Sequence, residues 1–334
     1  MNYRKILITG GAGFIGSHLT ERLLGDGMTV TVIDNLTTGN WSNLDHISQN
    51  ERLRVIVASA ADPRLLEKEV PRHDFVYHLA SAVGVKLIID HPVHTVENIV
   101  KTTEVVMKVC SKYRRPVLLT STSEVYGKSA EIPFREDADI VMGATSKRRW
   151  AYACAKALDE FLVLAHSYET NLPVFIVRLF NTVGPRQTGR YGMVLPSLVG
   201  QALSGKPMSV YGSGLQSRCF CSVHDVVNAL ARFLECPAAA GKVVNIGSEE
   251  EISILALAHK IKDLTGSDAE IELIPYEEAY GPGFDDMMRR VPDLTRARQL
   301  LGWAPQRKLN DIIRDIASSL APSDERILMG ASTR

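Results

Sequence analysis

A tyrosine and a lysine, Tyr152 and Lys156, stand four residues apart in a segment with helical periodicity. Residues four apart lie on the same face of a helix, so a phenol and an ammonium group can reach one substrate atom. Tyrosine has a pKa of about 10, and a nearby cation favours the phenolate; a decrease of about three units needs only about 4 kcal/mol. The pair therefore suits removal of a proton from an alcohol that is being oxidised. The same spacing also arises by chance, with an exposed lysine beside a half-buried tyrosine.

The first half of the chain alternates short apolar runs with helical periods, which predicts strands and helices in turn. Several runs are almost continuous in Val, Ile and Leu, as expected of parallel strands that are buried on both faces. The predicted strands are Lys5–Thr9, Thr29–Asp34, Leu53–Val57, Phe75–Leu79, Val117–Thr120 and Val174–Arg178. The predicted helices between them are Phe14–Leu24, Pro92–Tyr113 and Tyr152–Thr170. This alternation predicts an α/β fold with a Rossmann-type, doubly wound parallel sheet.

Glycine and proline become more frequent after about residue 180, and the predicted elements there are shorter and less regular. They are the strands Met208–Tyr211, Val243–Ile246 and Ile271–Ile274 and the helices Val223–Glu235, Ile254–Leu264 and Leu294–Leu300. We therefore expect a cofactor-binding domain over residues 1–180 that carries the Tyr152–Lys156 helix. A smaller, mixed α/β, substrate-binding lobe is expected over 181–321, followed by a flexible tail over 322–334.

The composition is that of an ordinary globular protein, and it excludes several partners. The 38 basic and 38 acidic residues balance, so no overall charge favours binding to nucleic acid or to an anionic membrane. No apolar run approaches the roughly 20 residues of a membrane helix, and the first residues lack a signal-peptide pattern. The five cysteines are scattered without a C-x-x-C pair, and Cys219-x-Cys221 is too tight for the usual zinc spacings. We expect reduced thiols, no metal and a cytoplasmic location.

A glycine-rich loop follows the first predicted strand and opens the first predicted helix. Gly10, Gly13 and Gly16 form G-x-x-G-x-x-G, a relative of the dinucleotide-binding fingerprint. Such a loop lets a pyrophosphate approach the positive N-terminus of the helix. Asp34 ends the second strand, 18 residues after Gly16, where an acidic residue binds the adenine-ribose hydroxyl groups. Because its carboxylate would repel a 2′-phosphate and Asn35 supplies no arginine, NAD is predicted rather than NADP.

In these features the chain resembles the nucleotide-sugar branch of the extended short-chain dehydrogenases/reductases over roughly residues 3–320. Besides the loop Thr9–Gly16, Asp34-Asn35 and Tyr152–Lys156, the resemblance depends on six further motifs. They are His78–Ser81, Ser121–Gly127, Arg178–Pro185, Val210–Gly214, Gln216-x-Arg218 and Gly302-Trp303-x-Pro305. It implies that Tyr152 is the base at the sugar C4 hydroxyl, and that Lys156 binds the nicotinamide ribose while lowering the pKa of Tyr152. It also implies that Thr122 contacts the reacting hydroxyl.

The resemblance further assigns residues to the cofactor, to the nucleotide-sugar substrate and to a dimer. The implied NAD-binding residues are Gly10, Gly13, Phe14, Ile15, Gly16, Asp34, Asn35, Gly39, Leu79, Ala80, Tyr152 and Lys156. The implied residues for a UDP-sugar are Lys86, Asn181, Arg186, Val194, Tyr211, Arg218 and Arg290. The apolar faces of Val93–Val109 and Tyr152–His166 match the helices through which the family forms a homodimer by a four-helix bundle.

The residues after Thr122 decide which reaction follows oxidation at C4. Ser123 and Glu124 resemble the UDP-glucuronate decarboxylases, in which an arginine matched here by Arg290 lies near the uronate carboxylate. A 4-keto-uronate is a β-keto acid, which loses carbon dioxide if an enolate is stabilised and C5 is protonated. The expected products are UDP-xylose, UDP-4-keto-pentose or both. The loop 82–86 instead resembles the 4-epimerases of UDP-glucose or UDP-glucuronate, and a non-catalytic NAD sensor is a third alternative.

Overall fold

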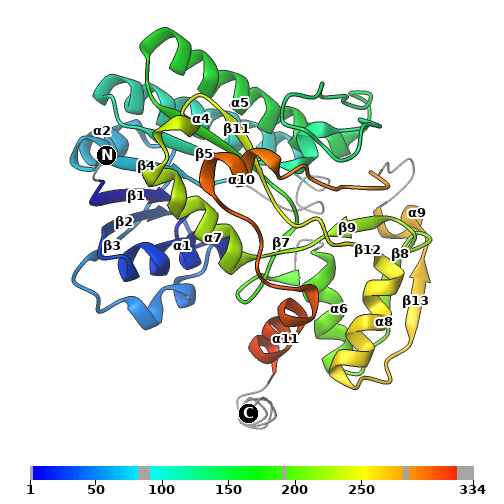
Figure 1. Ribbon diagram of the computed structural model, residues 1–334. Helices are drawn as coiled ribbons and strands as arrows, with labels where there is room; N and C mark the ends of the chain where they lie inside the picture. Colours follow the sequence, from blue (N-terminus) through cyan, green and yellow to red (C-terminus); the bar gives the residue numbers. More distant parts are fainter. Residues whose placement is uncertain (1–2, 82–90, 190–192, 281–285, 322–334) are drawn as a thin grey trace.

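A seven-stranded parallel sheet forms the centre of the protein, in a computed structural model that describes residues 3–81, 91–189, 193–280 and 286–321 (Figure 1). Its strand order is β11-β6-β5-β4-β1-β2-β3, and every pairing within it is parallel. The strands are β1 (Lys5–Thr9), β2 (Thr29–Asp34), β3 (Leu53–Val57), β4 (Phe75–His78), β5 (Val117–Thr122), β6 (Val174–Leu179) and β11 (Val243–Ile246). The predicted Rossmann-type sheet is confirmed.

Helices cover both faces of this sheet, because alternate side chains of each strand point to opposite faces. In β1, Ile6 and Ile8 join the core beneath α1 (Phe14–Gly25) and α7 (Val223–Arg232), whereas Leu7 joins the core on the other face. That second core lies beneath α2 (Pro63–Glu69), α4 (Pro92–Tyr113) and α5 (Ala151–Thr170). Helices α4 and α5 pack along each other across the top of Figure 1. None of the described helices is long and apolar enough to cross a membrane.

A second, smaller lobe has its own apolar core between helices and three two-stranded sheets. The pairs are β7 (Thr182–Val183) with β10 (Cys221–Ser222), β8 (Met208–Tyr211) with β13 (Ile271–Ile274), and β9 (Ser217–Cys219) with β12 (Glu251–Ser253). The helices are α6 (Val194–Leu203), α8 (Ile254–Thr265), α9 (Tyr276–Tyr280) and α11 (Leu309–Leu320). The chain returns from this lobe to the large sheet through α7, β11 and α10 (Thr295–Leu301). The smaller lobe is therefore not one continuous segment after residue 180, because α7, β11 and α10 pack with the large sheet. The exact domain limits stay a prediction.

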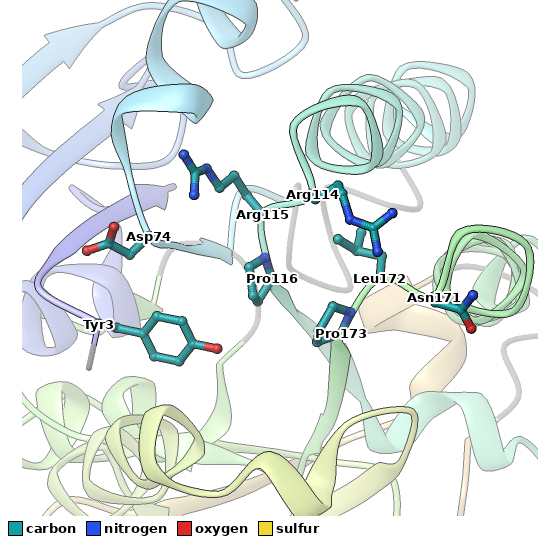
Figure 2. A pocket seen from close by; sticks show the side chains of 8 residues that line it. All are labelled: Tyr3, Asp74, Arg114, Arg115, Pro116, Asn171, Leu172 and Pro173. Atoms are coloured by element: carbon teal, nitrogen blue, oxygen red, sulfur yellow. The ribbon is translucent and has the colours of Figure 1, made fainter. Parts of the chain in front are cut away.

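The two ends of the large sheet differ in the residues that they present. A cavity of about 450 Å³ lies at the amino ends, where Tyr3, Asp74, Pro116 and Pro173 precede β1, β4, β5 and β6 (Figure 2). The glycine-rich loop, Asp34 and Thr122 all lie at the carboxyl ends of their strands. Ligands of parallel α/β sheets bind outside the carboxyl ends. The candidate site therefore lies at the opposite end of the sheet from this cavity.

Candidate active site

Tyr152, Lys156 and Thr122 meet where the first turns of α5 pass the end of β5. Alanine, the strongest helix former, occupies four of the first seven positions of α5. Tyr152 packs against Ile99 of α4, and its phenol forms a side-chain hydrogen bond with Thr122. Tyr152 is 8% exposed and Lys156 2% exposed, so both groups act in a medium where charges interact strongly. The structure thus brings together the three residues assigned to the C4 hydroxyl.

The electrostatics of Tyr152 differ from the expectation that Lys156 lowers its pKa. Burial raises the pKa of Tyr152 well above its usual value, the charges of Glu124 and Asp159 raise it further, and the hydrogen bond from Thr122 only partly offsets them. Burial is the largest of these causes, and Nζ of Lys156 is itself 3.0 Å from Oδ2 of the buried Asp159. The lowering of the Tyr152 pKa by Lys156 stays a prediction.

Glu124 lies inside a cluster of buried charges. It follows Ser123 in a short 3₁₀ turn, η4 (Ser123–Tyr126), which begins where β5 ends, and both residues are buried. Nη2 of Arg149 is 2.8 Å from Oε2 of Glu124, and Nη1 of Arg290 contacts Oε1. Burial by itself would raise the pKa of Glu124, but Arg149 and Arg290 outweigh burial and lower the pKa to about 2. Glu124 is therefore ionised at neutral pH.

Asp286 joins this cluster to Arg218. One carboxylate oxygen of Asp286 is 2.8 Å from Nη2 of Arg218, and the other is 3.3 Å from Arg149 and 3.4 Å from Arg290. Despite burial, the pKa of Asp286 is lowered by the three arginines. The cluster, which we call the arginine–acid cluster, comprises Glu124, Asp286, Arg149, Arg218 and Arg290 and carries three positive charges against two negative ones. It can therefore accept one further anionic group from a substrate.

The two adjacent arginines at 289 and 290 lie in different surroundings. Arg289 is paired with Glu251 at the surface, where the Arg289 side chain is 54% exposed. Arg290 is 7% exposed, and its buried Nε has no hydrogen-bond partner among the described residues. A buried donor without a partner is costly unless a ligand satisfies it. Of the two, Arg290 is therefore the buried one with a donor left for a ligand, and its contact with a uronate carboxylate stays a prediction.

The glycine-rich loop turns so tightly against its neighbours that a side chain on Gly10 or Gly16 would clash with backbone atoms. A Cβ on Gly16 would lie 2.1 Å from the carbonyl oxygen of Gly10, and one on Gly10, which has a φ of +77°, would lie 2.7 Å from the amide nitrogen of Ala80. Leu79 and Ala80 lie beside this loop, because the amide of Leu79 donates to the carbonyl of Thr9 at 3.0 Å. Phe14 and Ile15, also assigned to NAD, open α1 directly after Gly13.

Asp34 is oriented by the backbone around it. Oδ2 accepts a hydrogen bond from the amide of Ala12 at 2.9 Å, and Oδ1 accepts one from the amide of Leu36 at 2.8 Å. Gly39 lies so close that a Cβ there would be 2.8 Å from the carboxylate. Each carboxylate oxygen keeps a lone pair for a ribose hydroxyl. The side-chain oxygen of Asn35 instead accepts a hydrogen bond from the amide of Thr37, at 3.1 Å.

The residues assigned to the UDP-sugar lie in several places. Asn181 donates to the carbonyl of Cys219 at 2.9 Å, which places it beside Arg218. Tyr211 ends β8 and Val194 begins α6, both in the smaller lobe. Arg186 lies apart from the arginine–acid cluster, because it donates to Glu21 and Ser17 of α1 at 2.6 and 3.2 Å. Lys86 and the loop 82–86 lie outside the described residues.

Three residues around the site were not found from the sequence: Arg149, Asp286 and Asp159. Arg149 lies three residues before Tyr152, in a run of basic residues that gives no sign of burial. Asp286 is four residues before Arg290, but only the fold brings both to Arg218. Asp159 shares the helical face of Lys156 at i+3, and this spacing was available from the sequence. No group of three or more His, Cys, Asp or Glu residues that could hold a metal was found in the described part of the chain.

Comparisons with known proteins agree with this geometry. Residues 7–316 match the family described as GDP-mannose 4,6 dehydratase. UDP-N-acetyl-alpha-D-glucosaminuronate decarboxylase of Bacillus cytotoxicus is 40% identical over 90% of this chain and 93% of its own length. UDP-glucuronic acid decarboxylase 1 of Xenopus tropicalis is 36% identical, over 90% of this chain and 68% of its own length.

A solved structure is similar over almost the whole chain. UDP-glucuronic acid 4-epimerase of Bacillus cereus, in complex with UDP-glucuronic acid and NAD, has a TM-score of 0.83 and 28% identity, over 95% of this chain and 98% of its own. The fold, the placement of the tyrosine–lysine pair and the family match lead to one conclusion. The chain belongs to the GDP-mannose 4,6-dehydratase family, within the extended short-chain dehydrogenases/reductases.

Proposed function

We propose that the protein is an NAD-dependent decarboxylase of a UDP-hexuronate, with UDP-glucuronate as its substrate and UDP-xylose, UDP-4-keto-pentose or both as products. The observation that carries the proposal is the buried pair Arg149 and Arg290 around Glu124, within the arginine–acid cluster beside Tyr152. The buried Nε of Arg290 has no hydrogen-bond partner among the described residues, and a uronate carboxylate could accept from it. Two relatives with decarboxylase names, at 40% and 36% identity, support the same activity.

The cofactor would be held by the glycine-rich loop and by Asp34. The pyrophosphate fits the backbone of Gly10–Gly16 at the start of α1, and the adenine ribose fits the carboxylate of Asp34. Lys156 keeps donors for the nicotinamide ribose, since an ammonium group has three and Asp159 takes one. When bound, NAD supplies the two-electron acceptor for the C4 carbon of the sugar.

Tyr152 and Thr122 carry out proton transfer and stabilise the enolate. Tyr152 takes the proton of the C4 hydroxyl, and Thr122 orients that oxygen. Once C4 is a ketone, the carbon–carbon bond to the carboxylate breaks, carbon dioxide leaves and the electron pair moves towards the C4 oxygen. Tyr152 and Thr122 donate hydrogen bonds to the enolate oxygen, which is the point where negative charge develops. A proton added at C5 gives the UDP-4-keto-pentose. UDP-xylose would need two further steps at C4, the return of a hydride from the reduced cofactor and of a proton from Tyr152 to the oxygen.

Arg149 and Arg290 orient the carboxylate that is lost, while Glu124 makes its loss easier. A carboxylate beside the ionised Glu124 is repelled, and the repulsion weakens as its charge spreads into the transition state. Glu124 would therefore accelerate decarboxylation more than oxidation at C4. Arg218 and Asn181 would bind the diphosphate, because an arginine side chain forms paired, charge-assisted hydrogen bonds with phosphate oxygens.

A second substrate has a specific observation in its favour. The relative at 40% identity is named for UDP-N-acetyl-alpha-D-glucosaminuronate, which differs from UDP-glucuronate in the group on C2 of the sugar. Both sugars carry the carboxylate that the arginine–acid cluster fits. The 4-epimerase alternative is kept because the similar Bacillus cereus structure is a UDP-glucuronic acid 4-epimerase.

Mass spectrometry of the products, combined with proton NMR to determine the configuration at C4, separates these possibilities. The protein is incubated with NAD and, in separate reactions, with UDP-glucuronate, UDP-N-acetylglucosaminuronate and UDP-glucose. A product lighter by one carbon dioxide supports decarboxylation and identifies the preferred sugar. A product of unchanged mass but altered C4 configuration would replace our proposal with an epimerase, and no conversion of any sugar would favour an NAD sensor. Tyr152→Phe is the inactive control.

We further propose a homodimer through α4 and α5, in the cytoplasm. Leu158 and Phe161 of α5 are 51% and 65% exposed, and Val93 of α4 is 69% exposed, so an apolar surface runs along the two helices. Light scattering at several protein concentrations tests the dimer. Phe161→Glu should yield monomers, and a wild-type protein that stays monomeric would refute the dimer. Cell fractionation tests the location.

A further inference from the structure

The ammonium group of Lys156 is held by a buried acidic residue one helical turn further on. Asp159 is three residues after Lys156 on α5, and its Oδ2 is 3.0 Å from Nζ. The two side chains are 3% and 1% exposed, so water screens their attraction very little. The pair lies one turn beyond Tyr152 on the same helix. A charge on Asp159 therefore acts on both members of the tyrosine–lysine pair.

Among the described residues, Asp159 is the acid that forms an ion pair with Lys156, and the other neighbouring groups are neutral or paired elsewhere. His78, at the end of β4, faces Lys156 but is neutral, because burial and then the charge of Lys156 lower its pKa to about 3. From α4, Thr103 contributes a hydroxyl to Asp159. Glu160, the next residue, is already paired with Arg178 at 2.8 Å and with Ser121.

Among the residues that the structure describes, few groups face Tyr152, so the effect of one charge can be isolated. Glu124 approaches from η4, Thr122 from β5 and the apolar Ile99 from α4. Glu124 is itself balanced by Arg149 and Arg290. A lysine stabilises a neighbouring phenolate only to the extent that its charge is not offset by another group. Asp159 provides such an offset.

We propose that Asp159 is a positioning residue that fixes the Lys156 ammonium group, offsets its charge and thereby keeps Tyr152 protonated until substrate is bound. This inference rests on the proposed function, since it concerns the base at C4. Fixing Nζ 3.0 Å from Oδ2 also aligns its other donors for a ribose. A protonated Tyr152 is the form that donates to the C4 oxygen during loss of carbon dioxide. Asp159 thus favours the loss of carbon dioxide, which needs a protonated Tyr152, and disfavours the removal of the C4 proton, which needs its phenolate.

The variant Asp159→Asn tests this role, because it removes the charge and keeps an oxygen that accepts a hydrogen bond from Lys156. The ionisation of Tyr152 is followed by ultraviolet difference spectra of the phenolate, each compared with the same protein carrying Tyr152→Phe. We expect Tyr152 in the variant to ionise at a pH lower by about one unit. With substrate, the acidic limb of the pH profile of kcat/KM should move in the same direction, which raises the rate below the limb by up to about tenfold.

A matched control separates this effect from general loss of stability. Glu69 is also buried, at 1% exposure, and is paired with Arg54 in α2 and β3, away from the site. Glu69→Gln should lower stability without moving the ionisation of Tyr152. If Asp159→Asn does not fold, Asp159→Ser, which also lacks the charge, takes its place.

Two results would overturn the inference. A Tyr152 ionisation that is the same in wild type and Asp159→Asn would leave Asp159 with a role in stability alone. A shift to higher pH would mean that Asp159 assists the phenolate. Failure of the proposed function looks different: the wild type would release no carbon dioxide from any UDP-hexuronate, while the spectroscopic titration would still report the effect of Asp159.

Discussion

Replacing Glu124 by glutamine should affect both stability and the course of the reaction. The glutamine side chain keeps the size of glutamate and one acceptor oxygen. The arginine–acid cluster, however, loses one of its two negative charges and keeps its three positive charges. In wild type the pKa of Glu124 is lowered from 4.5 to about 2. Each pKa unit corresponds to about 1.4 kcal/mol, so the ionised carboxylate contributes about 3 kcal/mol to folding at neutral pH.

The sign of this contribution determines its pH dependence. A lowered pKa means that the folded protein binds a proton less readily than the unfolded chain does. The stabilisation is therefore complete above about pH 4.5 and is lost as the pH falls towards 2. Urea unfolding at pH 7 should give Glu124→Gln a free energy of unfolding about 3 kcal/mol below wild type, and the difference should shrink as the pH falls below 4.5.

Glu251 provides a matched control, because its pKa is also lowered to about 2, through a hydrogen bond from Arg289. That pair lies at the surface, where the arginine side chain is 54% exposed, and such pairs contribute at most about 1 kcal/mol. Glu251→Gln should thus unfold almost like wild type. Equal stabilities of Glu124→Gln and Glu251→Gln at pH 7 would refute the argument that burial makes the cluster energetically important.

The catalytic consequence of Glu124→Gln is measured as the ratio of released carbon dioxide to NADH formed on the enzyme. We expect release of carbon dioxide to slow by about a hundredfold or more, whereas oxidation at C4 changes little. The reason is that Glu124 faces the carboxylate-binding arginines, while Tyr152 and Thr122 act at C4. An unchanged ratio would remove Glu124 from the decarboxylation step.

Three further changes test other parts of the site. Tyr152→Phe removes the base and should abolish turnover while calorimetry still detects NAD binding; near-normal turnover would exclude Tyr152 as the base. Gly16→Ala places a Cβ 2.1 Å from the carbonyl oxygen of Gly10 and should weaken NAD binding strongly, whereas Gly200→Ala, where no atom lies within 4 Å, should leave it unchanged. Asp286→Asn removes the acid that contacts all three arginines and should lower kcat/KM for UDP-glucuronate at least tenfold in steady-state assays; a wild-type value would show that the arginines need no such partner.

The sequence was most informative where local patterns determine structure. The apolar runs that predict β1, β2 and β3 coincide with the observed strands. In β1 and β2 every residue after the first is buried, whereas β3, at the edge of the sheet, is only partly buried. The glycine loop was recognisable for a similar reason, since only glycine fits the close approach of Gly10 and Gly16. The helix Val194–Leu203 was not predicted, although most of its residues are apolar.

The arginine–acid cluster was predicted only in part, because it depends on contacts between distant segments. Glu124 and Arg290 were named from the resemblance, but 166 residues separate them and their direct ion pair is a property of the fold. Arg149 and Asp286 carried no sign of burial in the sequence. The spacing of Asp159 and Lys156 is readable from the sequence, but the burial of both side chains, which strengthens their ion pair, depends on the fold.

The arginine–acid cluster is better explained by binding than by stability. Removing five charged side chains from water costs several kcal/mol for each ion, and replacing such groups by apolar residues is often neutral or stabilising. A fold that needed only stability would gain little from three arginines and two acids beside Tyr152. The buried Nε of Arg290, which has no hydrogen-bond partner among the described residues, is instead what an additional anionic group would satisfy. Under the proposed function, Tyr152, Lys156 and Thr122 would serve oxidation at C4 of any UDP-sugar. Arg149, Arg290 and Glu124 would select a UDP-hexuronate and promote the loss of its carboxylate.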